Sequence, residues 1–131
     1  MKISFRTALA LALVTSVGWV GIAVAQPVKG MAEVGMMKPV TKVVGKEVIT
    51  TLKIKNMSKG PISGLKVSEF WYDKAGNSAP GAMVQLRQPL GAGEVKTLTL
   101  KTPWTDKMQS NKYQFSHAYG EVTVVTLAKI E

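Results

Sequence analysis

The 131-residue sequence predicts an all-β fold: an antiparallel immunoglobulin-like β-sandwich of six or seven strands, preceded by an N-terminal signal helix. Short segments that alternate apolar and polar residues recur along the chain, and turns rich in Gly, Pro and Asn separate them. Beyond residue 25 no segment has the apolar spacing of an amphipathic helix. Short, evenly spaced strands in roughly a hundred residues are typical of two packed sheets.

Residues 1–25 have the three parts of a secretory signal peptide. Lys2 and Arg6 form a basic start, an apolar run follows, and Ala23-Val24-Ala25 closes it with small residues. We expect cleavage after Ala25 and a periplasmic or secreted product. An uncleaved anchor is the alternative, because the apolar run is marginally long enough to span a bilayer. After cleavage no stable membrane span is expected.

The remaining chain is predicted to form one domain, which a short irregular segment precedes. Residues 26–46 contain Met, Gly and Pro without a lasting period, which indicates a flexible lead-in and a possible edge strand. Residues 47–131 are expected to form the β-sandwich domain. The sequence contains no cysteine, so disulfides, thiolate catalysis and cysteine-ligated zinc are excluded.

The charge balance is basic. Without Lys2 and Arg6, the 17 Lys and Arg fall to 15 against 8 Asp and Glu, a net charge of +7. The lysines interrupt apolar alternation instead of clustering, as on the wet face of a sheet, and no aromatic residues lie between them on a groove. We therefore expect no nucleic-acid partner and at most weak attraction to anionic surfaces.

The strands are predicted in order along the domain. The first, "EVITTLKIKN", directs Val48, Thr50, Leu52 and Ile54 inward, and only Ile49 breaks the alternation. Turn formers follow, and then the strand Leu65 to Tyr72. The later strands are expected at 82–88, at 94–101 with Leu98 and Leu100 inward, and in a final hairpin about Gly120.

The stretch "SEFWYDKAGN" is predicted to be a core strand that runs into a tight turn beginning at Asp73. Its apolar face carries Leu65, Val67 and Trp71, but Glu69 falls on that face too. A buried carboxylate requires a partner. His117, the one histidine of the chain, lies on a late strand that we expect beside this one. We predict that the Glu69 and His117 side chains approach within hydrogen-bonding or one-water distance, as a structural polar pair that fixes strand register. A catalytic role would need a nucleophile and a cleft that the sequence does not show.

The same stretch resembles the signature of the FxLYD-type extracytoplasmic domains of bacteria. Tyr72, Asp73 and Gly76 match that signature, while Glu69 and Trp71 occupy the positions of its Phe and Leu. The flanking segments "IKNMSKGPISGLKV" and "PLGAGEVKTLTL" are also similar to that family's. The resemblance implies a small β-sandwich in exported or envelope-attached proteins, generally of unassigned function, with no catalytic residues.

Binding residues are expected in the loops. Trp104 lies in the longest loop. We favour a tucked indole that covers the core, and the alternative is an exposed one that anchors a partner or glycan. Asp73 and Asn77 lie in the turn after the aromatic strand and are candidate contact residues.

The sequence predicts an exported, non-enzymatic β-sandwich module without cofactor or metal, which binds or scaffolds in the bacterial cell envelope. Its partner would be an envelope protein or a glycan. The alternative function is a periplasmic copper-binding protein that uses Met31, Met36 and Met37, because thioethers are soft ligands for Cu(I). Methionine also fills cores and tails.

Overall fold

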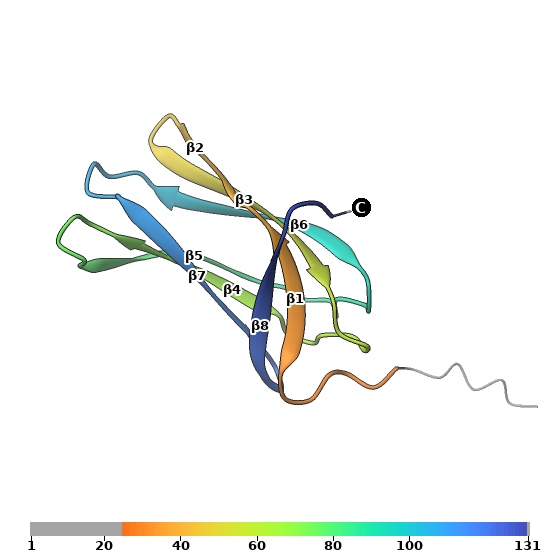
Figure 1. The fold of residues 1–131 in the computed structure, drawn as a ribbon. Coiled ribbons are helices and arrows are strands. Elements are labelled where there is room, and N and C mark those ends of the chain that lie inside the picture. Colours follow the sequence, from red (N-terminus) through yellow and green to blue (C-terminus); the bar gives the residue numbers. More distant parts are fainter. Residues whose placement is uncertain (1–24, 131) are drawn as a thin grey trace, which may run out of the picture.

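The computed structural model describes residues 25–130, and every regular element in that range is a β-strand (Figure 1). The expected signal peptide, residues 1–25, lies outside the described residues except for Ala25. The strands are β1 (Ala32–Met37), β2 (Val40–Val44), β3 (Glu47–Asn56), β4 (Lys66–Tyr72), β5 (Ser78–Gln85), β6 (Val95–Pro103), β7 (Ser110–His117) and β8 (Gly120–Leu127). Between residues 25 and 130 no helix has the length and apolar character needed to cross a lipid bilayer.

The strands form one curled sheet in the order β2-β3-β1-β8-β7-β4-β5, and β6 pairs with β3. The curl brings β2, β3 and β6 over β4, β5 and β7, while β1 and β8 close one side like a half-barrel (Figure 1). Most pairs are antiparallel, but β1 and β8 run parallel, so the sheet is mixed. The expectation of a purely antiparallel fold with six or seven strands is therefore wrong in both respects.

The two additional strands lie in the segment that we expected to be a flexible lead-in. β1 is flanked by β3 and β8, with Ala32 and Val34 fully buried, so it is an interior strand. Gly35 explains part of its irregular sequence, because a Cβ there would collide with the Leu127 side chain. β2 is the edge strand that the sequence allowed for.

The inward pattern of β3 and β6 is as predicted. The buried residues of β3 are Val48, Thr50, Leu52 and Ile54. On the neighbouring strand β6, Leu98 pairs with Leu52 and Leu100 pairs with Thr50. The apolar part of the core lies toward the middle of the curl and contains Ala32, Val34, Leu52, Ile54, Ile62, Leu65, Val67, Leu86, Leu90, Leu98, Leu100 and Phe115. Burial of this surface stabilises the fold by about 25 cal/mol per Å² of apolar area removed from water.

Candidate functional site

Three connections meet at one end of the curled sheet, which we call the loop end (Figure 1). They are the β2–β3 turn at residues 45–46, the β4–β5 turn at 73–77 and the β6–β7 loop at 104–109. The backbone N–H of Trp104 donates to the Lys46 carbonyl at 2.8 Å, and that of Gln109 donates to the Tyr72 carbonyl at 2.9 Å. These bonds fix the β6–β7 loop to both of its neighbours.

Trp104 is 47% exposed at this end of the molecule. The side chain is thus only partly covered, and it is not the fully tucked residue that we favoured from the sequence. Its backbone is held by the Lys46 carbonyl, so the indole is presented from a fixed point. An aromatic residue held in this way can bury a large contact area at little cost in conformational entropy.

The Asp73–Asn77 turn is closed by a network of its own hydrogen bonds. Asp73 Oδ1 accepts from the Asn77 backbone N–H at 2.9 Å, and Oδ2 accepts from Asn77 Nδ2 at 3.2 Å. The Asn77 backbone bond is the main reason that the pKa of the Asp73 carboxyl lies below its ordinary value. Gly76 supplies the positive φ, 83°, that the turn requires.

A hollow of about 260 Å³ separates the turn from the loop. Trp71, Asp73 and Asn77 line one side, and Thr105, Lys107 and Met108 line the other. The structure thus places Asp73 and Asn77 against the loop that carries Trp104, although Trp104 itself is bonded through its backbone to the β2–β3 turn and does not line the hollow. Among residues 25–130 no three His, Asp or Glu side chains cluster as metal ligands do. The surface carries an indole, amide and carboxylate groups and a lysine. These groups can form apolar contacts, hydrogen bonds and ion pairs with a partner.

Beneath the loop end, Glu69 is buried at 1% exposure and accepts three hydrogen bonds. Its Oε1 accepts from Trp71 Nε1 at 3.0 Å, and its Oε2 accepts from Thr50 Oγ1 at 2.9 Å and Asn111 Nδ2 at 3.1 Å. The donors come from β3, β4 and β7, so one carboxylate joins the two sides of the curl. Trp71 connects this network to the hollow that it lines.

Tyr113 lies directly across from Glu69 in the β4–β7 pair. Its hydroxyl accepts a hydrogen bond from Asn111 Nδ2 at 2.8 Å. Burial, followed by the nearby Glu69 carboxylate, raises the pKa of Tyr113 to about 12. The phenol therefore stays neutral over the whole physiological pH range.

Glu69 and His117 do not form the predicted pair. β4 and β7 are neighbours, as expected, but Glu69 pairs with Tyr113, four residues from His117. At about 3.3 Å per residue the two positions are roughly 13 Å apart along the strand. His117 Nε2 instead contacts the Gly30 carbonyl at 2.6 Å, and its Nδ1 accepts from the Tyr119 backbone N–H at 3.3 Å. Both residues are buried and satisfied, with separate partners.

The sequence contains a signal for the partners of Glu69, namely polar residues at inward positions of the neighbouring strands. Thr50 is a polar residue between Val48 and Leu52 on the inward face of β3, just as Glu69 is a polar residue between Val67 and Trp71 on the inward face of β4. Asn111 shares the alternation of Tyr113 and Phe115.

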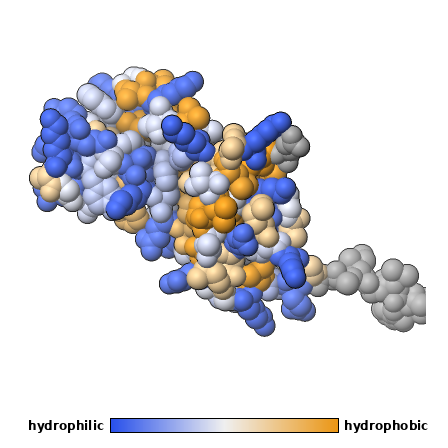
Figure 2. Space-filling view, in the orientation of Figure 1, coloured by the Kyte–Doolittle hydropathy of each residue, from blue (hydrophilic) through white to orange (hydrophobic). Residues whose placement is uncertain are grey.

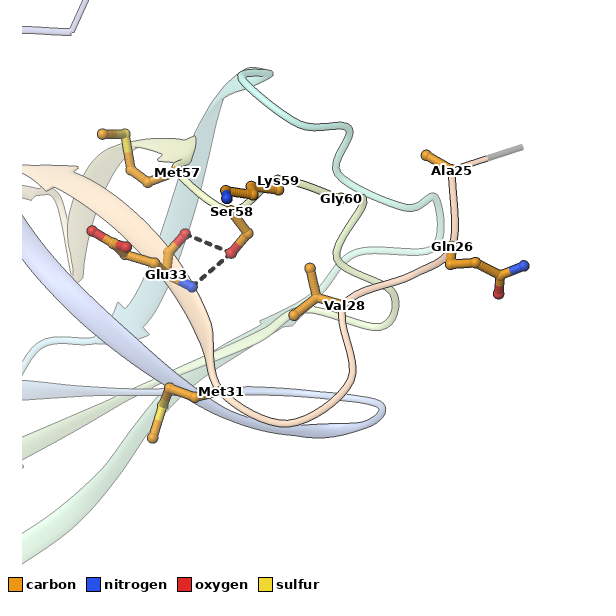
Figure 3. Close-up of a pocket in the computed structure, with 9 residues that line it drawn as sticks. All are labelled: Ala25, Gln26, Val28, Met31, Glu33, Met57, Ser58, Lys59 and Gly60. Atoms are coloured by element: carbon orange, nitrogen blue, oxygen red, sulfur yellow. Dashed lines mark hydrogen bonds between the residues drawn. The ribbon is translucent and has the colours of Figure 1, made fainter. Parts of the chain in front are cut away.

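The three methionines named as candidate Cu(I) ligands lie in different surroundings. Met36 packs against the core, and its neighbour Met37 points to the opposite face of β1. Met31 is exposed and lines a hollow of about 520 Å³ with Met57 and Glu33. Figure 3 shows the Met31 and Met57 side chains pointing away from each other, while the Glu33 backbone is bound by Ser58 Oγ. This arrangement gives no observation in favour of Cu(I) binding.

No family model and no curated protein sequence matches this chain. Among solved structures, the fold is similar to that of IrmA from Escherichia coli, with a TM-score of 0.51 and 10% sequence identity. The similarity covers 72% of this chain and 91% of IrmA. At this identity the likeness concerns the fold alone.

Proposed function

We propose that the protein is an exported, non-enzymatic binding module of the bacterial cell envelope, which contacts a protein or glycan partner through its loop end. The observation that carries the proposal is the 47% exposure of Trp104 on a loop whose backbone is bonded to the neighbouring turn. Tryptophan is a frequent hot-spot residue in interfaces because it buries a large area with few rotatable bonds.

The surroundings of Trp104 support recognition as its role. Binding residues commonly lie on loops held by a rigid scaffold, and the β6–β7 loop is hydrogen-bonded here to the β2–β3 turn and to the end of β4. The Glu69 network lies below the same end and joins strands from both sides of the curl. A preorganised surface loses little freedom when the partner binds.

Export and fold family are further parts of the proposal. The signal-like residues 1–25 support a periplasmic or secreted protein, with cleavage after Ala25. The FxLYD-like stretch around Tyr72 and Asp73 supports kinship with extracytoplasmic domains. The two groups of strands, β2-β3-β6 and β8-β7-β4-β5, support an immunoglobulin-like sandwich in which β1 joins the groups.

Affinity capture from envelope extract tests the proposed surface. Wild-type protein and the Trp104→Ala variant are immobilised at equal density, and the captured proteins and glycans are quantified. We expect capture of the specific partner to fall at least about tenfold, the effect of losing a hot spot of roughly 1.4 kcal/mol or more.

Tyr119→Ala is the matched control, because Tyr119 is an exposed aromatic at the opposite end of β7. It should leave capture unchanged. Equal capture by wild type and Trp104→Ala, or a loss confined to Tyr119→Ala, would reject the loop end as the contact surface.

A further inference from the structure

The edges of the sheet differ in how well they are protected. β5 carries Pro80 and a register irregularity against β4, and both discourage pairing with a further strand. The outer side of β6 faces β5, where the Ala82 backbone N–H donates to Thr102 Oγ1 at 3.1 Å. β2 is different: within the described residues it pairs with β3 on one side only, and all five of its residues are exposed.

The exposed residues of β2 are unusually apolar for an edge strand. Val40, Val43 and Val44 are each more than half exposed, and Figure 2 shows apolar side chains gathered over the β2–β3 hairpin. Ile49, the residue that broke the inward pattern of β3, lies on the outer face beside Lys42. Val40, Val44 and Ile49 line a shallow hollow of about 380 Å³ on that face.

The charges around this hollow are mostly positive, and the exception is the exposed Glu47, which pairs with Val44. Lys42 pairs with Ile49 from β2, and Lys101 pairs with the same residue from β6, so Ile49 lies between two lysines. Lys38 and Lys46 flank the two ends of β2. The free edge therefore presents valines on both sides of a central lysine, within a basic surround.

We propose that the free edge of β2 binds an extended segment of a partner protein, which adds to the sheet as a strand and places an acidic residue opposite Lys42, with apolar residues opposite Val40 and Val44. The inference deepens the proposed function, on which it rests, by naming the class of partner. In strand addition the unpaired backbone groups of the edge supply affinity, and alternate side chains supply specificity. The Trp104 backbone bond to Lys46 places the proposed anchor at the end of the same strand.

A second copy of this chain fits the edge poorly. An antiparallel β2–β2 pair in full register places Lys42 opposite Lys42, and like charges in directly opposed positions destabilise a pair. Lysine on an edge strand is a common protection against self-association. The same lysine is complementary to an acidic residue, so it selects a different protein as the occupant.

The test uses two capped synthetic peptides and amide NMR spectra of the purified protein. The acidic peptide is Ser-Val-Thr-Glu-Thr-Val-Ser, whose palindromic order permits either strand direction, and the basic peptide has Lys in place of Glu. We expect the acidic peptide, in the millimolar range, to shift the amides of β2 saturably and to slow their hydrogen exchange. The basic peptide should bind about five- to tenfold more weakly, the usual difference between unlike and like charges in opposed positions.

A charge-swapped variant at Lys42 gives a second test. Lys42→Glu should bind the basic peptide better than the acidic one, which reverses the wild-type preference. Unchanged β2 amides with the acidic peptide, or the same preference in Lys42→Glu, overturn the inference. So do β2 shifts that depend only on protein concentration, which would identify a second copy, or shifts caused by phosphatidylglycerol vesicles and not by peptide, which would identify a lipid surface. If these overturning results accompany a loss of capture in Trp104→Ala, the proposed function stands and this inference alone fails.

Discussion

Glu69 shows how one side chain can organise a small domain. It lies on the apolar face of β4, where a carboxylate without partners would be costly. Donors from Thr50, Trp71 and Asn111 satisfy both of its oxygens, and they come from three different strands. Such a network is stabilising only while all of its members are present, because each donor left alone carries its own desolvation cost.

The Glu69→Gln variant tests the network. An amide can present its nitrogen either to Trp71 or to Thr50 and Asn111, and in both orientations an N–H donor loses its acceptor. We expect the free energy of unfolding to fall by about 1–3 kcal/mol, the usual cost of an unsatisfied buried polar group. Urea unfolding measures it, with Glu121→Gln, an exposed carboxylate, as the control that should stay within about 0.5 kcal/mol of wild type. Equal midpoints for Glu69→Gln and wild type would contradict the role assigned to Glu69.

Tyr113 gives the network a signature at high pH. Its pKa is raised from about 10 in the unfolded chain to about 12 in the folded protein. The raised value means that stability is unaffected below pH 10 and is lost as the pH rises from about 10 to about 12, because only the unfolded chain ionises there. We expect Tyr113→Phe to lack this loss and to lack the last tyrosinate step in an ultraviolet titration. An identical last step in wild type and variant would show that the phenol is not shielded.

Two-residue alternation predicts which side chains point inward. The structure confirms this prediction for Val48, Leu52, Val67 and Trp71. The partner of Glu69 could not be predicted in the same way. Alternation tells which face a residue takes, but the register between β4 and β7 decides which residues meet, and that register depends on the whole pair. His117 is on the expected strand and face, four residues from the expected position.

At the scale of elements, the β4–β5 pair contains an irregularity at Glu69. Ser68 pairs with Met83 and Phe70 with Pro80, so Glu69 faces two residues of β5. Gly81 is one of them, and a Cβ at this position would collide with the backbone carbonyl of Glu69. Absence of a side chain is what allows the two backbones to approach here.

We expect Gly81→Ala to destabilise the fold by about 1–3 kcal/mol, the range found when an atom is forced into a packed site. The neighbouring backbone is not a flexible side chain and can move only by shifting β4. Thermal unfolding measures the effect, and Ser78→Ala on the same strand is the exposed control. If both variants unfold together with wild type, the close approach of β5 to Glu69 is incorrect.

The sequence did not predict β1 as an interior strand and allowed for β2 only as a possible edge strand, because neither strand has one buried and one exposed face. β1 has neighbours on both sides and buries Val34 and Gly35 in succession, so it lacks the alternation by which a half-buried strand is detected. β2 is exposed on both faces, so neither of its faces is buried. β3, β4 and β6 each bury one face, and the sequence located them within two residues.

At the scale of the whole molecule, the apolar core and the polar network lie in different parts of the curled sheet. The apolar core lies toward the middle and holds the sheet together, while the polar network and three connections occupy the loop end. The parallel pairing of β1 with β8 joins the first strand to the last. Such long-range pairing is absent from local sequence patterns, because it depends on where the closed sheet brings the chain ends. Trp104 and the free edge of β2 are thus presented side by side from a fixed scaffold.

Site-specific photo-crosslinking in intact cells tests the central claim most directly. A photoreactive phenylalanine analogue replaces Trp104 in one variant and Tyr119 in the other, both on exposed positions at opposite ends of β7. The account predicts a discrete adduct from position 104 and none from position 119. An adduct from position 119 alone would show that the partner meets the opposite end of the sheet and would contradict the account.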